Sequence, residues 1–147
     1  MFFTWNYQSN HVFLGVDTNS KASIIHTNGN PNSHIILRGS KNCPNYYENN
    51  VTETCKLLQE KGHVPRVMID CSHGNSQKKF KNQLIVAESI ATQLKNNNIL
   101  GIMVESNINE GNQKITDNLQ YGVSITDSCL NLNDTDKLLE IICDKIN

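Results

Sequence analysis

The sequence predicts an α/β fold in which parallel strands are covered by helices. Short, continuously apolar runs alternate along the chain with amphipathic segments, and turn-forming residues border the runs. Continuous apolar strands of this kind are typical of parallel sheets that are buried on both faces. No repeat period and no linker rich in Pro, Gly or Ser divides the 147 residues, a length that suits one ordinary domain.

Three strands are predicted in the first forty residues. HVFLGV at His11–Val16 reads as a short buried strand, and ASIIHT at Ala22–Thr27 and HIILRG at 34–39 are two more. The last two are separated by NGNPNS, whose Asn, Gly and Pro residues favour a turn. We therefore expect a β-hairpin near residues 22–39.

Helices and strands alternate in the rest of the chain. Residues 51–62 are predicted to form a helix because their apolar positions share one face and a glycine, Gly62, suits its end. RVMID at 66–70 and LGIMVES at 100–106 are the next strands. Between them, apolar residues of the segment 77–97 recur every three or four positions, which predicts a long amphipathic helix.

The C-terminal part begins with a polar loop after residue 106. It leads to YGVSITD at 121–127, the last strand-like run. A final amphipathic helix is predicted over 134–146, with Asn133 or Asp134 as its cap.

Composition excludes several classes of partner. The net charge is −1, from 13 basic and 14 acidic residues, so we expect neither nucleic acid nor an anionic membrane as a partner. No apolar run approaches the roughly 20 residues of a membrane span, and the first residues lack the pattern of a signal peptide. The five cysteines form no CxxC pair, which disfavours a zinc ribbon. These features predict a cytoplasmic protein with reduced thiols.

Polar residues that could carry chemistry stand where the predicted strands end. Arg38 follows HIIL, His73 follows RVMID, Glu105 follows GIMV, and Asp127 ends YGVSITD. The last three are about one strand–helix unit apart from each other. Because functional groups of parallel α/β folds collect at strand ends, these side chains could converge at one rim.

The residue types at this rim suit a metal ion and an anion. One imidazole and two carboxylates, from His73, Glu105 and Asp127, suit a divalent cation of the Mn, Fe, Co or Zn kind better than Ca or Mg. The fork of the Arg38 guanidinium matches carboxylate or phosphate oxygens. The alternative interpretation is a loop histidine, a surface glutamate and an N-cap aspartate, and spacing alone leaves it open. Cys71 shares the strand parity of His73 and is interpreted as a buried packing thiol.

Four blocks of sequence resemble one enzyme family. ILRGSK, MIDCSHGNSQK, GIMVESNINEGNQ and YGVSITDSC are similar, in order and approximate spacing, to the signatures of the type I 3-deoxy-D-arabino-heptulosonate-7-phosphate (DAHP) synthases. The resemblance implies a TIM (β/α)8 barrel. Residues 11–147 would form its C-terminal half, roughly strands five to eight with their helices. Residues 1–10 match none of the family motifs, and we expect a replaced or mis-started end there.

The resemblance also implies a reaction. Enzymes of this family condense phosphoenolpyruvate with erythrose 4-phosphate and release phosphate, the first step of the shikimate pathway to aromatic amino acids. A divalent metal ion polarises the aldehyde carbonyl. Matched motif by motif, the metal ligands and catalytic residues would be His73, Glu105 and Asp127. Asp127 would also lie near the aldose phosphate, and Arg38 would bind phosphoenolpyruvate.

Part of the family pattern has no counterpart in this sequence. The cysteine ligand of the first strand and a KPRT-type loop that holds both substrates are missing, and a complete barrel typically needs about 250 residues. A half barrel leaves open sheet edges and an uncovered apolar interior. We therefore expect a homo-oligomer or pairing with a complementary N-terminal half.

Two alternatives to a DAHP synthase are considered. The first is a catalytically inactive remnant that acts only as a metal-binding or subunit-binding module. The second is a different barrel enzyme that joins phosphoenolpyruvate to another aldose phosphate. The ESNINEGNQ and YGVSITD blocks argue against the second, because they resemble the type I DAHP synthases specifically.

Overall fold

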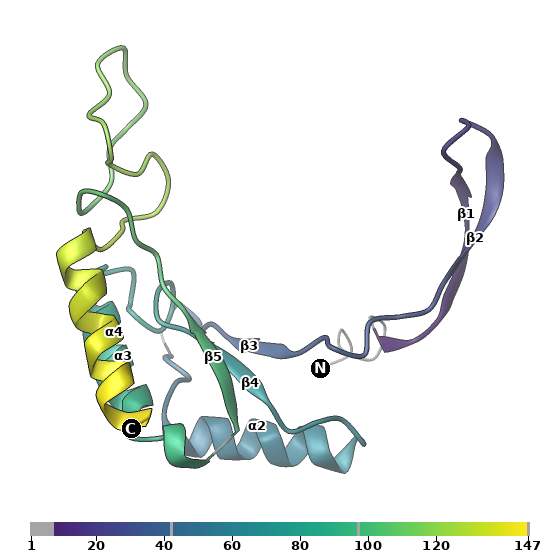
Figure 1. Cartoon of the computed structure of the whole chain (residues 1–147), viewed down its shortest axis with the longest axis horizontal. Helices are drawn as coiled ribbons and strands as arrows, with labels where there is room; N and C mark the ends of the chain where they lie inside the picture. The colour runs from purple at the N-terminus through teal and green to yellow at the C-terminus, as the bar shows by residue number, and fades with distance from the viewer. Residues whose placement is uncertain (1–7, 42, 97, 147) are drawn as a thin grey trace. The chain divides into compact units, whose positions relative to one another are not determined.

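The computed structural model describes residues 8–41, 43–96 and 98–146 (Figure 1). The chain divides into two compact units, Met1–Ile35 and Ile36–Asn147. The second unit mixes a sheet with helices, so the predicted α/β class is confirmed for it. Within the described residues, no helix has both the length and the apolar character that crossing a bilayer requires.

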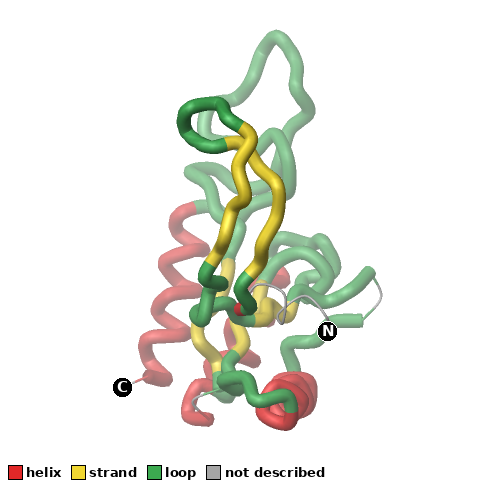
Figure 2. Tube along the Cα trace, turned by 90° about the vertical axis from the view of Figure 1, so that its right-hand side faces the viewer, coloured by secondary structure: helices red, strands yellow, loops and turns green. Residues whose placement is uncertain are grey.

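The first unit is built on an antiparallel hairpin of β1 (His11–Val16) and β2 (Ala22–Thr27). Figure 2 shows its two strands side by side in yellow, joined by a green turn. The prediction of a hairpin near residues 22–39 is therefore wrong, because β2 pairs with the strand before it. The expectation that β1 is buried is also wrong, since Val12 and Leu14 are 62% and 79% exposed. A two-stranded hairpin provides no second layer of its own to cover them.

The turn of this hairpin depends on one aspartate. The Asp17 carboxylate accepts hydrogen bonds from the backbone N–H groups of Asn19 and Lys21, at 2.8 and 3.0 Å. Ser20 adopts a left-handed φ of 60°. An aspartate that bonds to the backbone two residues ahead mimics a backbone turn. The hairpin turn therefore forms in DTNS, a sequence without glycine or proline. NGNPNS also turns, with the Ser33 N–H donating to the Asn30 carbonyl at 3.2 Å, but this turn does not connect two paired strands.

The second unit contains a three-stranded sheet in the order β3 (Ile35–Leu37), β4 (Val67–Asp70) and β5 (Ile99–Met103). β4 and β5 are parallel, as their apolar sequences predict. The middle strand is the most deeply placed, and its Val67 and Ile69 side chains are fully buried. All three strands are shorter than predicted. β3 and β5 end early because the residues that follow them leave the sheet, whereas β4 begins one residue late and ends at Asp70 as predicted.

Three helices accompany this sheet. α2 (Glu48–Glu60) contacts β4, while α3 (Asn82–Ala91) and α4 (Leu132–Ile146) pack side by side (Figure 1). The core between the last two helices and the end of β5 centres on three fully buried residues and the apolar residues packed around them. The buried ones are Ala87, Leu130 and Leu138, and the surrounding ones include Phe80, Leu84, Ile102 and Val104.

The long helix and the last strand-like run also differ from the prediction. The helix expected over 77–97 begins only at Asn82, because Gln77 and Lys78 have left-handed φ angles of 55° and 59°. It ends at Ala91, and a short 3-10 turn, η1 (Leu94–Asn96), follows. The run at 121–127 is irregular and forms only an isolated bridge, through Ser124.

The last helix has a different cap from the one predicted. Asn131 Oδ1 accepts a hydrogen bond from the backbone N–H of Asp134 at 2.8 Å. This contact from a side chain to the N–H three residues later is the usual N-cap geometry. Asn131 therefore caps α4 in place of Asn133 or Asp134.

Candidate metal and substrate site

The site is built where the chain leaves β4. His73 adopts a φ of 49°, which turns the chain sharply, and Gly74 then lies against the loop that follows β3. A Cβ on Gly74 would lie 2.6 Å from the carbonyl carbon of Gly39 and from the nitrogen of Ser40. Only glycine allows two backbones to approach this closely. The loops after β3 and β4 are therefore held in direct backbone contact.

Asn75 fixes this junction from inside. Its buried side-chain amide donates hydrogen bonds to the carbonyls of Leu37 and Asp70, at 2.9 and 2.8 Å. Its Oδ1 accepts a hydrogen bond from the backbone N–H of Asn45 at 2.8 Å. One side chain thus ties the ends of two strands to the segment before α2. This explains why small polar residues follow an apolar strand in the sequence.

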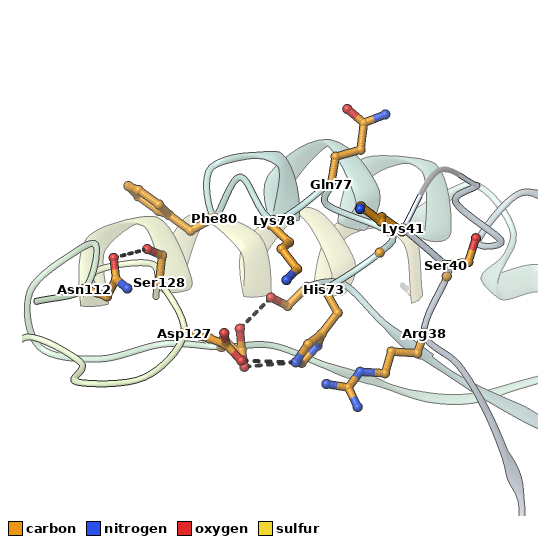
Figure 3. Close-up of a pocket in the computed structure, with 14 residues that line it drawn as sticks. Arg38, Ser40, Lys41, His73, Gln77, Lys78, Phe80, Asn112, Asp127 and Ser128 are labelled. Carbon is orange, nitrogen blue, oxygen red and sulfur yellow. Dashed lines mark hydrogen bonds and ion pairs between the residues drawn. The ribbon is translucent and has the colours of Figure 1, made fainter. Parts of the chain in front are cut away.

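The three side chains predicted to form a cluster come together in the structure (Figure 3). His73 Nε2 lies 3.4 Å from Glu105 Oε1 and 3.5 Å from Asp127 Oδ2. One donor atom from each of the three residues lies within 4.8 Å of the others. The spacing argument for convergence is therefore correct, although Asp127 reaches the site from an irregular loop and not from a strand.

This arrangement fits a divalent cation. When two atoms bind the same zinc-like ion at about 2.0–2.2 Å, with a tetrahedral angle at the ion, the two atoms lie about 3.4 Å apart. The separations from His73 Nε2 to the two carboxylates agree with that value. The other ring nitrogen, Nδ1, faces Asp70, so Nε2 is the atom directed at the cluster. The donor set of one nitrogen and two or more oxygens is the one expected for Mn, Fe, Co or Zn.

A cavity of about 800 Å³ opens beside the cluster. Arg38 lines it together with Lys41 and Lys78, so cationic and anionic side chains share its wall (Figure 3). The Arg38 guanidinium is 61% exposed, and its Nε lies 3.7 Å from Asp70 Oδ2. Within the described residues, no other ion pair or hydrogen bond occupies this guanidinium. Arg38 is therefore placed to meet an anion in the cavity.

Asp70 is a site residue that the sequence did not single out. It is the last residue of β4 and is buried, yet its carboxylate accepts a hydrogen bond from the Ser72 N–H at 2.8 Å. Its second oxygen lies 2.8 Å from His73 Nδ1. The available signal was an acidic residue that ends an otherwise apolar strand, RVMID.

Glu105 is held by two residues that were also missed. The Ser72 hydroxyl donates a hydrogen bond to Glu105 Oε2 at 2.6 Å. Gln83, which is fully buried in α3, donates to the Glu105 carbonyl at 3.0 Å and accepts from the Glu105 N–H at 2.9 Å. Both backbone groups of a residue in the candidate cluster are therefore paired by one side chain. The sequence feature that could have identified Gln83 is a glutamine on the apolar side of a predicted helix.

Asp127 lies in a loop held together by side-chain amides. Asn112 donates a hydrogen bond to the Thr126 carbonyl at 2.9 Å and accepts one from the Ser128 hydroxyl at 2.7 Å. These bonds flank Asp127, whose side chain is 64% exposed. The third member of the cluster is therefore positioned by its neighbours along the chain and not by a strand.

Cys71 behaves as the predicted packing thiol. It is fully buried and is not among the three residues whose donor atoms converge. Burial, assisted by the charge of neighbouring Asp70, raises the pKa of the Cys71 thiol to about 12. The thiol is therefore protonated at neutral pH and is a poor metal ligand.

Comparison with known proteins identifies the family of this chain. Residues 4–140 match the family model of the DAHP synthetase I family. The chain belongs to this family. It is 43% identical over 142 residues to the Tyr-sensitive phospho-2-dehydro-3-deoxyheptonate aldolase of Escherichia coli, and the match covers 93% of this chain and 40% of that protein.

Two further relatives extend the comparison. The phenylalanine-inhibited aldolase of Saccharomyces cerevisiae is 42% identical, over 92% of this chain and 40% of its own length. The solved structure of the Francisella tularensis aldolase superposes with a TM-score of 0.89 at 38% identity, over 95% of this chain and 42% of that one. The chain thus spans about 40% of the length of these relatives.

Proposed function

We propose that this chain provides part of a DAHP synthase, which condenses phosphoenolpyruvate with erythrose 4-phosphate to give DAHP and phosphate. The observation that carries the proposal is the convergence of His73, Glu105 and Asp127 beside Arg38 in one cavity. Membership of the DAHP synthetase I family, whose relatives are named as DAHP aldolases, gives the reaction. The step would open the shikimate pathway to aromatic amino acids.

Each residue has a distinct role in this proposal. His73, Glu105 and Asp127 hold a divalent cation of the Mn, Fe, Co or Zn kind, which supplies Lewis-acid polarisation of the aldehyde carbonyl. Arg38 binds the carboxylate or phosphate of phosphoenolpyruvate through its exposed fork. Asp127 lies nearest the loop side of the cavity, where the aldose phosphate would enter.

The proposed architecture is the C-terminal half of a TIM barrel over residues 11–147, roughly strands five to eight. The parallel pair β4 and β5, with α3 between them in sequence, supports a repeating strand–helix order. The strands also carry exposed apolar side chains: Ile36, Leu100 and Met103 are 44%, 48% and 40% exposed. A second copy of the chain or a complementary N-terminal half would cover these positions and complete the cavity.

The experiment is a complementation assay. The purified chain is mixed with a polypeptide that covers the N-terminal part of the Escherichia coli relative, and phosphate release from the two substrates is measured with added Mn²⁺. We expect release only from the mixture, and none when His73→Ala replaces the wild-type chain. The matched control is Asp117→Asn, which removes a charge on an exposed loop residue.

Two outcomes would contradict the proposal. Equal phosphate release by the wild-type and His73→Ala mixtures would show that the cluster has no role in the reaction. Tight metal binding and tight association with the complementary half, without release from any mixture, would favour a metal-binding or subunit-binding module instead.

A further inference from the structure

Asp70 is a buried charged residue to which the proposed reaction assigns no role. Its side chain is only 3% exposed, although it ends a strand next to an open cavity. The cost of removing a carboxylate from water is high unless donors surround it. The Ser72 N–H donates to the Asp70 carboxylate at 2.8 Å, His73 Nδ1 lies 2.8 Å from it, and Arg38 Nε forms an ion pair with it at 3.7 Å. These contacts offset the cost of burying the Asp70 carboxylate.

The contact with His73 determines which ring nitrogen faces the cluster. An imidazole that donates Nδ1–H to a carboxylate keeps its lone pair on Nε2. In this structure Nε2 is the atom that lies 3.4 and 3.5 Å from the carboxylates of Glu105 and Asp127. A ring that carried its proton on Nε2 would present a hydrogen where a cation must bind.

The backbone around Asp70 keeps this geometry rigid. The Asp70 carbonyl accepts a hydrogen bond from the buried amide of Asn75, and the preceding residue, Ile69, is fully buried. Two residues further on, the Ser72 hydroxyl holds Glu105 Oε2 at 2.6 Å. The four-residue segment 70–73 therefore orients two of the three members of the cluster.

We propose that Asp70 is a positioning residue that fixes the His73 ring, with its proton on Nδ1 and Nε2 directed at Glu105 and Asp127. Arg38 contributes to this arrangement because its guanidinium balances the Asp70 charge from the cavity side. The inference rests on the proposed function only in that His73 is taken as a metal ligand. It requires neither turnover nor substrate binding.

The first test is a Co²⁺ titration of the whole chain, followed by visible absorption. Ser72 and His73 contact different oxygens of Asp70, and an asparagine replaces one of these oxygens by an NH₂ group, so one of the two contacts loses its acceptor. We expect Asp70→Asn to bind Co²⁺ about 10- to 100-fold more weakly, the usual effect of losing the carboxylate partner of a metal-binding histidine. Asp117→Asn, the same chemical change in an exposed loop, should bind like the wild type.

The second test separates positioning from a general loss of structure. If Asp70 acts through His73, Asp70→Asn should have no further effect on Co²⁺ affinity in a chain that already carries His73→Ala. An additive loss in the double variant would overturn the inference.

The third test uses the wild-type chain, so it holds even if Asp70→Asn does not fold. Two-dimensional ¹⁵N–¹H spectra of the metal-free chain, recorded at a pH where the His73 ring carries one proton, report which ring nitrogen holds that proton. We expect the Nδ1–H form of His73. The Nε2–H form would overturn the proposal.

The titrations distinguish the inference from the proposed function. A wild-type chain that binds Co²⁺ no better than His73→Ala would overturn both. A wild-type chain that binds Co²⁺ tightly, with Asp70→Asn binding equally well, would overturn the positioning role alone.

Discussion

The two sides of the site are built by different means. His73 and Glu105 lie on the strand-end side, where close backbone contacts and buried amides fix the chain after β4 and β5. Asp127 lies on the loop side, where amide side chains at the surface hold an irregular segment. Neither His73 nor Glu105 is on a strand, but each follows a strand end by no more than three residues. Groups this close to a rigid sheet are held more accurately than groups on long loops. The cluster therefore combines two preorganised residues with one that can adjust.

This difference has a functional consequence. A cation needs a fixed starting geometry, which the imidazole and its neighbours supply. Entry and exit of substrates need part of the wall to move, and loops with exposed hydrogen bonds open at a lower free-energy cost than buried strands. The comparison between the strand-end side and the loop side can be tested with matched substitutions.

The largest contrast in unfolding free energy is expected between two glutamine substitutions. Gln83 holds backbone groups on the strand-end side, and Gln113 holds them on the loop side. Gln83→Ala would leave the Glu105 N–H unpaired, while the Glu105 carbonyl keeps its bond from the Leu130 N–H at 3.0 Å. Together with the cavity left by the fully buried side chain, this should lower the free energy of unfolding by about 2–4 kcal/mol. Gln113→Ala removes a similar set of bonds, to Gln120 and Val123, but water can replace them. Its expected cost is about 1 kcal/mol or less. Urea unfolding of both variants measures the contrast, and equal losses would contradict it.

Metal affinity should show the next largest difference. His73→Ala removes a preorganised ligand, so Co²⁺ affinity should fall more than about 100-fold, beyond the usual effect of losing an outer partner. Asp127→Ala should lower the Co²⁺ affinity by a smaller factor, because this exposed carboxylate must be ordered when the ion binds. Titration of both variants under the same conditions gives the ratio. A larger loss for Asp127→Ala would show that the loop side is the more rigid one.

A pair of glycines extends the comparison to the backbone. Gly74→Ala would place a methyl group 2.6 Å from the Gly39 backbone, so the two loops must separate, at a cost of about 2–3 kcal/mol. Gly111, on the loop side, has a φ of 86° with open space around it. Gly111→Ala should therefore cost only about 1 kcal/mol, from the left-handed conformation alone. Urea unfolding compares the two, and Gly74→Ala should also weaken Co²⁺ binding.

The same contrast explains what the sequence could predict. His73, Glu105, Asp127 and Arg38 were all identified because each stands at the end of a strand-like run. Motif likeness then gave them their expected roles. The supports of these residues were not identified. Asp70 looks like the end of a strand and Gln83 like one polar position in an amphipathic helix, and their partners become visible only when distant segments meet. The hairpin was misplaced because NGNPNS has stronger turn residues than DTNS, whereas Asp17 closes the real turn through its side chain.

The smallest expected effect is a difference in the labelling rates of two buried thiols, Cys71 on the strand-end side and Cys129 on the loop side. It is measured in the wild-type chain. Burial, with the Asp70 charge, raises the pKa of Cys71 to about 12. Burial also raises the pKa of Cys129 on the loop side, but a hydrogen bond with Ser124 partly offsets it. Because the thiolate is the reactive form, a raised pKa slows labelling at pH 8, and labelling accelerates as the pH rises towards that pKa.

The ratio of labelling rates by a thiol reagent, Cys129 over Cys71, should therefore exceed one, because Cys71 is fully buried and its pKa is raised to about 12. Opening of the loop would add to this ratio, because the strand-end side stays closed. Mass spectrometry of peptides from the native chain, after timed labelling, measures the two rates. Exposed Cys43 and Cys143 serve as internal references for full access. Cys71 reacting as fast as Cys129 would mean that the segment after β4 opens as readily as the loop, and the strand-end side would then not be the preorganised part of the site.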